Sequence, residues 1–333
     1  MKRGLCAAML ALGAAPLAAA AEPMQVKYGN AGTPGQIAYV TAVEPFAAQV
    51  TAASDGAIEV KLFPGPSLAS HNNVIDRLQN GVCEIGFGLI GLYPQLFPKT
   101  TVAMLPFESR NPHEAGVALM RLYEKGAFGD ELAPYKVLSL PVYANMSVHT
   151  KKPVATLADL KGMKVATMSR TMAVVLDKLG ATPITMPPVD FHQSLMRGVV
   201  DAAGIGWPGI PPFKLTEVTG YHVQTSLTAE GAFNFMTKVA YAKLPDKGKQ
   251  AIDRFAGMPY SLMWAKAIQA MDDQGIAMTK AANQPINTLA PDEEARWKQR
   301  AQIVVDEWTK ATPDGAKVLA AYRAEIANIR AGK

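Results

Sequence analysis

The sequence predicts an α/β protein in which a parallel sheet is covered by helices. The first observation is residues 157–201, where short strands and short helices alternate with very short connections. Alternation of this kind is typical of a parallel sheet, in which ligands bind beyond the carboxyl ends of the strands. The second observation is length, because 333 residues are enough for two lobes. The third is an apolar leader that precedes residue 22.

The first 21 residues have the pattern of a secretory signal peptide. Lys2 and Arg3 precede an apolar run over residues 5–17, and the small residues 19–21 follow it. The apolar run is too short to span a membrane. We therefore expect residues 1–21 to be a signal peptide that is cleaved near Ala21, and the mature protein to be periplasmic.

Charge and cysteine content exclude several classes of function. The formal net charge falls by two, from +5 to +3, when Lys2 and Arg3 are removed, so we expect no nucleic-acid partner. Cys6 lies in the leader, which leaves Cys83 alone and allows no internal disulfide. The histidines are far apart and the chain carries no metal-binding or catalytic sequence motif. We therefore expect no metal, no cofactor and no catalysed reaction.

The first half of the chain predicts alternating strands and helices. Apolar residues at alternate positions indicate strands, and apolar residues at helical spacing indicate helices. The strands are expected at 24–30, 58–63 and 84–90, and the helices at 39–53 and 72–80. Asn111 followed by Pro112 predicts the start of a further helix. Residues 136–150 are expected to form one strand that runs into the second lobe.

The second half predicts a parallel sheet and then a helical tail. Within the alternating segment, the strands are expected at 163–167, 182–186 and 199–204, and the helices at 169–180 and 188–198. A rigid loop rich in glycine and proline is expected after Asp201. A strand at 231–244 returns to the first lobe. Helices are expected over 245–282, from Pro291 onwards, and over 313–330.

The motifs DLKGMKV, LGATPITMP and LMRGVVDA occur in this order over residues 159–202. In them the chain resembles the solute-binding proteins of tripartite ATP-independent periplasmic (TRAP) transporters, of the C4-dicarboxylate type. The resemblance extends over about residues 24–310 and rests on several short motifs in order. It implies the two-lobed α/β fold of periplasmic binding proteins, with a ligand cleft between the lobes and a long helix spanning both.

The resemblance also implies a division of the chain into lobes. Lobe I is expected from residues 22–148 together with 232–275, and lobe II from 149–231 together with 276–333. We expect the lobes to close on the ligand by a hinge motion about crossings near 148–152 and 228–235.

One departure from the family pattern shapes the ligand prediction. Ala166 stands where the resemblance implies an arginine that holds a carboxylate by two parallel hydrogen bonds. Ser147 aligns with a second arginine of the family, and Gly204 and Ile205 replace a glutamate and an asparagine. The expected pocket has therefore exchanged charge for apolar bulk. We expect an organic acid with an aromatic or otherwise bulky apolar body.

Arg170 is the candidate replacement anchor for the carboxylate. It lies at the start of the helix after the strand, where free N–H groups also favour an anion. Ser169 and Thr167 share this turn and can donate hydrogen bonds. Trp207 is the aromatic candidate for stacking on the ligand. The alternatives are a surface role for Arg170 and core packing for Trp207. The other candidate ligand-binding residues are Ala166, Met146, Ser147, Asn145, Asn234, Phe233, Tyr28, Asn30 and Tyr93.

The resemblance implies the extracytoplasmic subunit of a TRAP transporter, which captures a small organic acid and delivers it to the membrane permease subunits. One alternative is a conventional C4-dicarboxylate or sugar-acid binding protein of the same class. Another is a periplasmic sensor subunit. An exported enzyme would require an activated nucleophile with a base beside it, and the sequence contains no such set.

Overall fold

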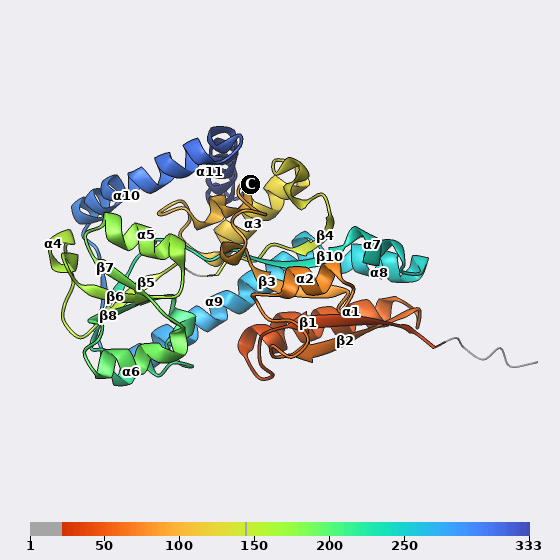
Figure 1. Ribbon diagram of the computed structural model, residues 1–333, viewed down its shortest axis with the longest axis horizontal. Coiled ribbons are helices and arrows are strands. Elements are labelled where there is room, and N and C mark those ends of the chain that lie inside the picture. The colour runs from red at the N-terminus through yellow and green to blue at the C-terminus, as the bar shows by residue number, and fades with distance from the viewer. Residues whose placement is uncertain (1–21, 144) are drawn as a thin grey trace, which may run out of the picture.

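The computed structural model describes residues 22–143 and 145–333, so the predicted signal peptide lies outside the described residues. Figure 1 shows two α/β parts side by side, each with its own sheet. In the described ranges, no helix has the length and apolar character needed to cross a membrane. The predicted two-lobed α/β class is confirmed.

The first lobe is built on a five-stranded sheet in the order β2-β1-β3-β10-β4. Its strands are β1 (Met24–Asn30), β2 (Ile58–Pro64), β3 (Ile85–Leu89), β4 (Tyr135–Ser139) and β10 (Ala232–Thr237). The first three strands run parallel, and β10 is antiparallel to β3 and β4. Its helices are α1 (Glu44–Ala53), α2 (Val74–Gln79), α3 (Pro112–Glu124), α7 (Lys238–Ala242) and α8 (Asp246–Phe255). Separate apolar cores lie on the two faces of the sheet.

The second lobe is built on a six-stranded sheet in the order β11-β9-β5-β8-β6-β7. Its strands are β5 (Ser147–Thr150), β6 (Lys164–Thr167), β7 (Thr182–Thr185), β8 (Ala202–Ile205), β9 (Tyr221–Gln224) and β11 (Ile286–Thr288). Its helices are α4 (Leu157–Leu160), α5 (Arg170–Lys178), α6 (Phe191–Met196) and α10 (Pro291–Ala311). Strand β6 pairs in parallel with β7 and β8, as the alternating segment predicts.

Two chain segments cross from one sheet to the other and pair with each other. We call residues 140–146, apart from 144, and residues 225–231 the crossing ribbon. The two segments run antiparallel, and the Tyr143 N–H donates to the Glu230 carbonyl at 2.8 Å. The predicted crossings lie a few residues later along the chain, where β5 and β10 are already paired within their sheets.

Two predicted strands are wrong in extent. Residues 136–150 are not one strand but β4 and β5, which belong to different sheets. Pro141 lies between them and has no N–H to donate to a ladder. The predicted strand 231–244 ends at Thr237, whose side chain caps α7 by accepting from the Ala240 N–H at 3.1 Å. Strand β9 (Tyr221–Gln224) begins in the stretch that was expected to be loop, and β11 (Ile286–Thr288) lies between two predicted helices, where no element was predicted.

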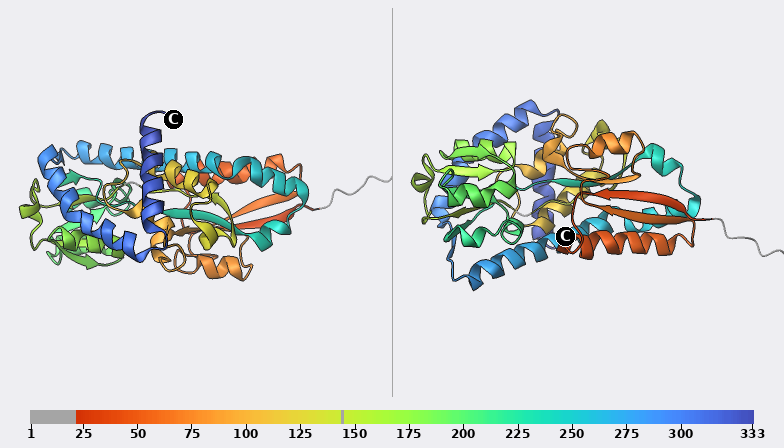
Figure 2. Two further views of the ribbon diagram at one scale, coloured as in Figure 1. Left: turned by 90° about the horizontal axis from the view of Figure 1, so that it is seen from above. Right: turned by 60° about the horizontal axis from the view of Figure 1, so that its bottom comes forward.

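The predicted long helix exists, although it is shorter than expected. Gly257 has a φ of +75° and separates α8 from α9 (Met258–Ala281). A left-handed residue of this kind ends a helical run, and glycine adopts it without strain. Helix α9 packs against α3 in the first lobe and against the turn Trp207–Gly209 in the second. Figure 2 shows it, in light blue, running from one lobe to the other.

The C-terminal helices connect the lobes a second time. Helix α10 packs on α5, whereas α11 (Gly315–Arg330) packs on α3 of the first lobe. Arg330 of α11 pairs with Glu114 of α3 at 2.9 Å. The predicted lobe II includes the whole tail, whereas the packing of α11 associates it with the first sheet. The exact lobe boundaries remain a prediction.

We predict that Gly275→Ala destabilises the protein by about 1–3 kcal/mol, the usual range for overpacking. A Cβ at this position of α9 would lie 2.1 Å from the Trp207 carbonyl oxygen, so the helix and the turn would have to separate. Thermal unfolding of the full mature chain measures the effect. Gln274→Ala, at an exposed position one residue earlier, is the matched control. Equal melting temperatures for the two variants would contradict the close packing of α9 on the turn.

Candidate functional site

A cavity of about 240 Å³ lies between the two lobes. The carboxyl ends of β3, β6 and β8 reach it, as expected for a ligand site in an α/β fold. Ligand pockets usually measure roughly 300–1,000 Å³, so this cavity suits a small ligand. Its wall consists of His71, Leu89, Tyr143, Met146, Met168, Ser169, Met172, Pro188, Ile205, Gly206, Pro208, Gly209, Phe213, Thr228, Ala229 and Glu230.

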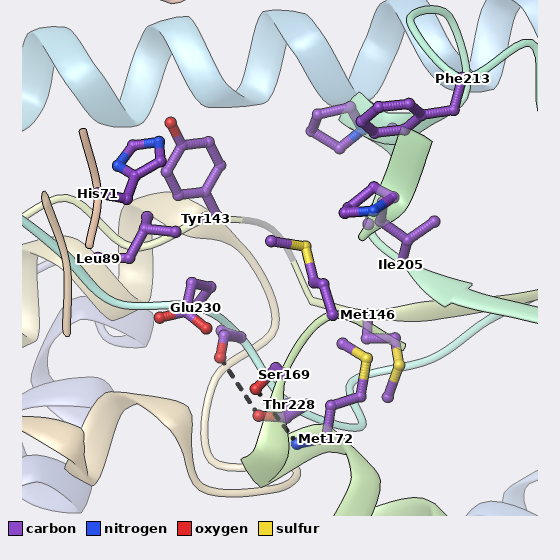
Figure 3. A pocket seen from close by; sticks show the side chains of 16 residues that line it. His71, Leu89, Tyr143, Met146, Ser169, Met172, Ile205, Phe213, Thr228 and Glu230 are labelled. Atoms are coloured by element: carbon purple, nitrogen blue, oxygen red, sulfur yellow. Dashed lines mark hydrogen bonds between the residues drawn. The ribbon is translucent and has the colours of Figure 1, made fainter. Parts of the chain in front are cut away.

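The wall is mainly apolar. In Figure 3, His71, Tyr143 and Leu89 lie on one side, Phe213 and Ile205 lie on the other, and Met146 lies between them. Methionine side chains are flexible and pack well against aromatic rings. No lysine or arginine is among the lining residues that the structure describes. An apolar wall of this kind agrees with the expected pocket, whereas the exchange of a family arginine for Ala166 remains a prediction.

The second-lobe side of the cavity is formed by the turn between β6 and α5. Ser169 caps α5, because its Oγ accepts from the Met172 N–H at 3.4 Å. The N–H of Ser169 donates to Thr167 Oγ1 at 3.4 Å. Ser169 and Met172 both line the cavity. The first N–H groups of a helix have no intrahelical partner and carry partial positive charge, so this end of α5 favours an anion. Arg170 is the first residue of α5 and is exposed.

The first-lobe side presents the acidic side chain of Glu230, which lies on the crossing ribbon. Its Oε1 accepts from the Gly91 N–H at 3.0 Å. Burial raises the pKa of Glu230 to about 7. A Cβ at residue 91 would lie 2.7 Å from Oε1, so a glycine is needed for this approach. Glu230 is therefore held against the first lobe while it faces the cavity (Figure 3).

His71 and Tyr143 separate the main cavity from a second one of about 140 Å³, which both residues also line. Tyr93 donates its hydroxyl to the His71 carbonyl at 2.6 Å and so holds the residue in place. Burial lowers the pKa of His71 and raises the pKa of Tyr143, so both side chains are neutral near pH 7. Asn30 lines the smaller cavity.

The structure brings some of the predicted site residues together. Met146 and Ser169 line the main cavity, and Thr167 holds the turn below Ser169. Tyr93 positions His71 through a hydrogen bond to its carbonyl. Asn30 lines the smaller cavity, where its side chain accepts from the Gly32 N–H at 2.8 Å.

Other predicted residues lie in the cores of the lobes. Tyr28 donates to Asn234 Oδ1, and Asn234 Nδ2 donates to Ser139 Oγ at 2.7 Å inside the first sheet. Phe233 stacks on Phe235 with ring centroids 4.3 Å apart. These contacts place the three predicted residues inside the first lobe, and their contact with a ligand remains a prediction.

Three further predicted residues are buried near the start of the second lobe. Asn145 donates from Nδ2 to the Ser109 carbonyl at 3.1 Å. Ser147 and Ala166 are fully buried on β5 and β6. Their contact with a ligand remains a prediction, as does that of Arg170.

Trp207 is 2% exposed and lies outside the cavity wall. Its ring centroid lies 5.0 Å from that of His149 and 5.7 Å from that of His222. The two histidines face each other with Nδ1 atoms 2.7 Å apart. Burial, together with the neighbouring His222, lowers the pKa of His149 to about 3. Trp207 thus supports the turn whose Pro208 and Gly209 line the cavity.

Several lining residues were not predicted from the sequence, above all His71, Tyr143, Phe213, Thr228 and Glu230. Glu230 had a usable signal, because it is a lone acid in the apolar stretch TAEGAFNF. Phe213 lies in the loop rich in glycine and proline, and Tyr143 lies in the stretch that was predicted to be one strand.

Comparisons with known proteins agree with this geometry. A family model described as bacterial extracellular solute-binding protein, family 7, matches residues 29–311. A TRAP solute-binding protein from Rhodoferax ferrireducens, solved with copurified benzoate, is 27% identical with a TM-score of 0.82, and the match covers 92% of this chain and 98% of that one. A marine metagenome TRAP protein, specific for aromatic acids and solved with 3-hydroxybenzoate, has the same identity, TM-score and coverage.

A curated relative extends the similarity to almost the whole chain. The ectoine/5-hydroxyectoine-binding periplasmic protein of Ruegeria pomeroyi is 26% identical, and the match covers 97% of this chain and 96% of that one. The resemblance seen in the sequence motifs is therefore confirmed.

We predict that the buried histidine pair makes the protein acid-labile. Burial lowers the pKa of both His149 and His222, so the fold keeps them neutral. Below about pH 6.5, the usual histidine pKa, the unfolded chain takes up protons that the folded chain does not, and stability falls as the pH falls.

Thermal unfolding between pH 7.5 and pH 4.5 measures this effect. His149→Gln should flatten the fall in melting temperature, whereas His113→Gln, at an exposed position, should keep the slope of the unmodified protein. Parallel slopes for all three proteins would refute the role of the pair.

Proposed function

Because the chain belongs to family 7 of the bacterial extracellular solute-binding proteins, we propose that it captures an aromatic organic acid and delivers it to a TRAP membrane permease. The protein would be exported with residues 1–21 as a cleaved signal peptide and would act in the periplasm. It would catalyse no reaction. Ligand would stabilise the closed form by contacting both lobes.

The observation that carries this proposal is the composition of the cavity wall. The cavity is small and its wall is mainly apolar. Its side chains can surround a single ring, namely those of Met146, Met168, Met172 and Phe213. A dicarboxylate would bring two charges into a cavity whose described lining includes no lysine or arginine, and one of them would face Glu230. Solved relatives at 27% identity bind benzoate and 3-hydroxybenzoate, which supports the same class.

We propose that the ligand carboxylate binds at the start of α5. Ser169 supplies a hydroxyl on the cavity wall, and the free N–H groups of the first turn supply partial positive charge. Arg170 is the first residue of α5 and would add a full positive charge on the same turn. In this proposal, these groups bind the ligand carboxylate in place of the arginine that the family resemblance implies at position 166.

A second candidate ligand is a small cyclic zwitterion. The acidic side chain of Glu230 favours it, because a cationic group beside Glu230 would pair with the carboxylate. The relative from Ruegeria pomeroyi, whose name states ectoine and 5-hydroxyectoine, makes this class worth testing.

We predict that benzoate and 3-hydroxybenzoate raise the melting temperature of the mature protein, whereas succinate, malate and ectoine do not. A ligand that binds only the folded form stabilises it by mass action. Differential scanning fluorimetry with each acid measures the shift. A shift with succinate, malate or ectoine alone would overturn the aromatic assignment.

The anchor is tested by calorimetric titration of benzoate into variants. Ser169→Ala and Arg170→Gln should each weaken binding by about fivefold or more, since each removes a favourable interaction with the anion. Arg197→Gln, an exposed arginine elsewhere on the second lobe, is the matched control. Unchanged affinity in both anchor variants would move the carboxylate away from α5.

A further inference from the structure

The geometry assigns Glu230 as the residue that selects aromatic acids with a hydroxyl group on the ring, at the end remote from the carboxylate. This inference rests on the proposed function and names the ligand more closely. Glu230 lies on the cavity wall and comes from the crossing ribbon, not from the turn where the carboxylate is proposed to bind.

One oxygen of Glu230 is used by the fold and the other is left for a ligand. Oε1 accepts from the Gly91 N–H at 3.0 Å, which fixes the carboxyl group against the first lobe. Within the described part of the chain, Oε2 has no hydrogen-bond partner. When a ligand fills the cavity and displaces water, an oxygen that faces it becomes costly unless the ligand donates to it or accepts from it. A ligand that brings such a group into the cavity removes this cost.

The neighbours of Glu230 do not compensate its charge. The titratable side chains that share the wall with it are His71 and Tyr143, and burial keeps both neutral near pH 7. Leu89 and Ala229 are apolar. Glu230 must therefore be matched by the ligand rather than by the protein.

A ring hydroxyl matches Glu230 in both of its protonation states. A hydroxyl donates to an ionised carboxylate and accepts from a protonated one. A second carboxylate on the ligand could only accept when ionised, and it would repel an ionised Glu230. A bare ring edge offers neither a donor nor an acceptor and would leave Oε2 desolvated and unpaired. Sites that are built to hydrogen-bond a ligand group reject analogues that lack it.

The two polar groups of the cavity wall lie on different parts of the fold. Ser169 and the first turn of α5 belong to the second lobe, whereas Glu230 is tied through Gly91 to the first. A ring with a carboxylate at one end and a hydroxyl at the other would join the two lobes through polar contacts. An unsubstituted acid would have a polar contact at one end alone.

The test compares three ligands that differ at one position, namely benzoate, 3-hydroxybenzoate and 3-methoxybenzoate. A methoxy group accepts but does not donate. Isothermal titration at pH 8, where the carboxylate form of Glu230 prevails, should show 3-hydroxybenzoate binding about 10- to 100-fold more tightly than the other two. At pH 5.5 the protonated carboxyl also donates to a methoxy oxygen, so the preference for hydroxyl over methoxy should shrink.

The variant Glu230→Gln tests the selectivity of the site while it keeps the contact with Gly91 that the fold uses. Its amide oxygen still accepts from Gly91, but its amide nitrogen can only donate, so the hydroxyl and methoxy acids should bind within about threefold of each other. Glu230→Gln should also make the hydroxyl preference independent of pH. Glu124→Gln, at an exposed position on α3, should behave like the unmodified protein.

Equal binding of benzoate and 3-hydroxybenzoate by the unmodified protein would overturn the role of Glu230 and leave the proposed function standing. An undiminished preference for hydroxyl in Glu230→Gln would overturn that role as well. If none of the three acids binds, the proposed function itself fails. Tight binding of ectoine that is lost in Glu230→Gln would then identify a small cyclic zwitterion as the ligand instead of an aromatic acid.

Discussion

The arrangement of the molecule depends on the pairing of the two segments in the crossing ribbon. The N–H groups of Tyr143 and Met146 donate to the carbonyls of Glu230 and Thr228, at 2.8 and 2.7 Å. These hydrogen bonds keep the two antiparallel connections between the lobes side by side. Because all four side chains also line the cavity, the same ribbon holds the lobes together and forms part of the ligand site.

The cavity combines a mainly apolar wall with two polar groups that come from different lobes. The turn at Ser169 offers donors to an anion, and Glu230 offers a carboxyl group that is fixed by Gly91. Apolar burial supplies much of the affinity in sites of this kind, and a few placed polar groups supply orientation and selectivity. Ala166 at the position where the resemblance implies an arginine is therefore compatible with acid binding, provided that the anion is held from the start of α5, as proposed.

Fold class and the alternating segment were predictable because local periodicity reports them directly. Strands β6, β7 and β8 lie where the sequence pattern predicts them. The break at Pro141 and the helical end of the return strand after Thr237 depend on pairing across the two sheets, which a local pattern does not contain. The candidate site was predicted in part, through Met146 and Ser169, since the motifs mark the strand ends. Glu230 was missed because its importance arises from Gly91, which is remote in sequence.

The position of Glu230 on the crossing ribbon has a mechanical consequence. In a hinge, atoms near the axis are displaced least and atoms far from it travel furthest. In the proposed closure, Glu230 and Met146 would keep almost the same place in the open and closed forms, whereas Ser169 and α5 would sweep toward them. The ring substituent would then be recognised first, against a surface that is already formed in the open protein. The carboxylate would be bound afterwards, and that contact would hold the lobes closed.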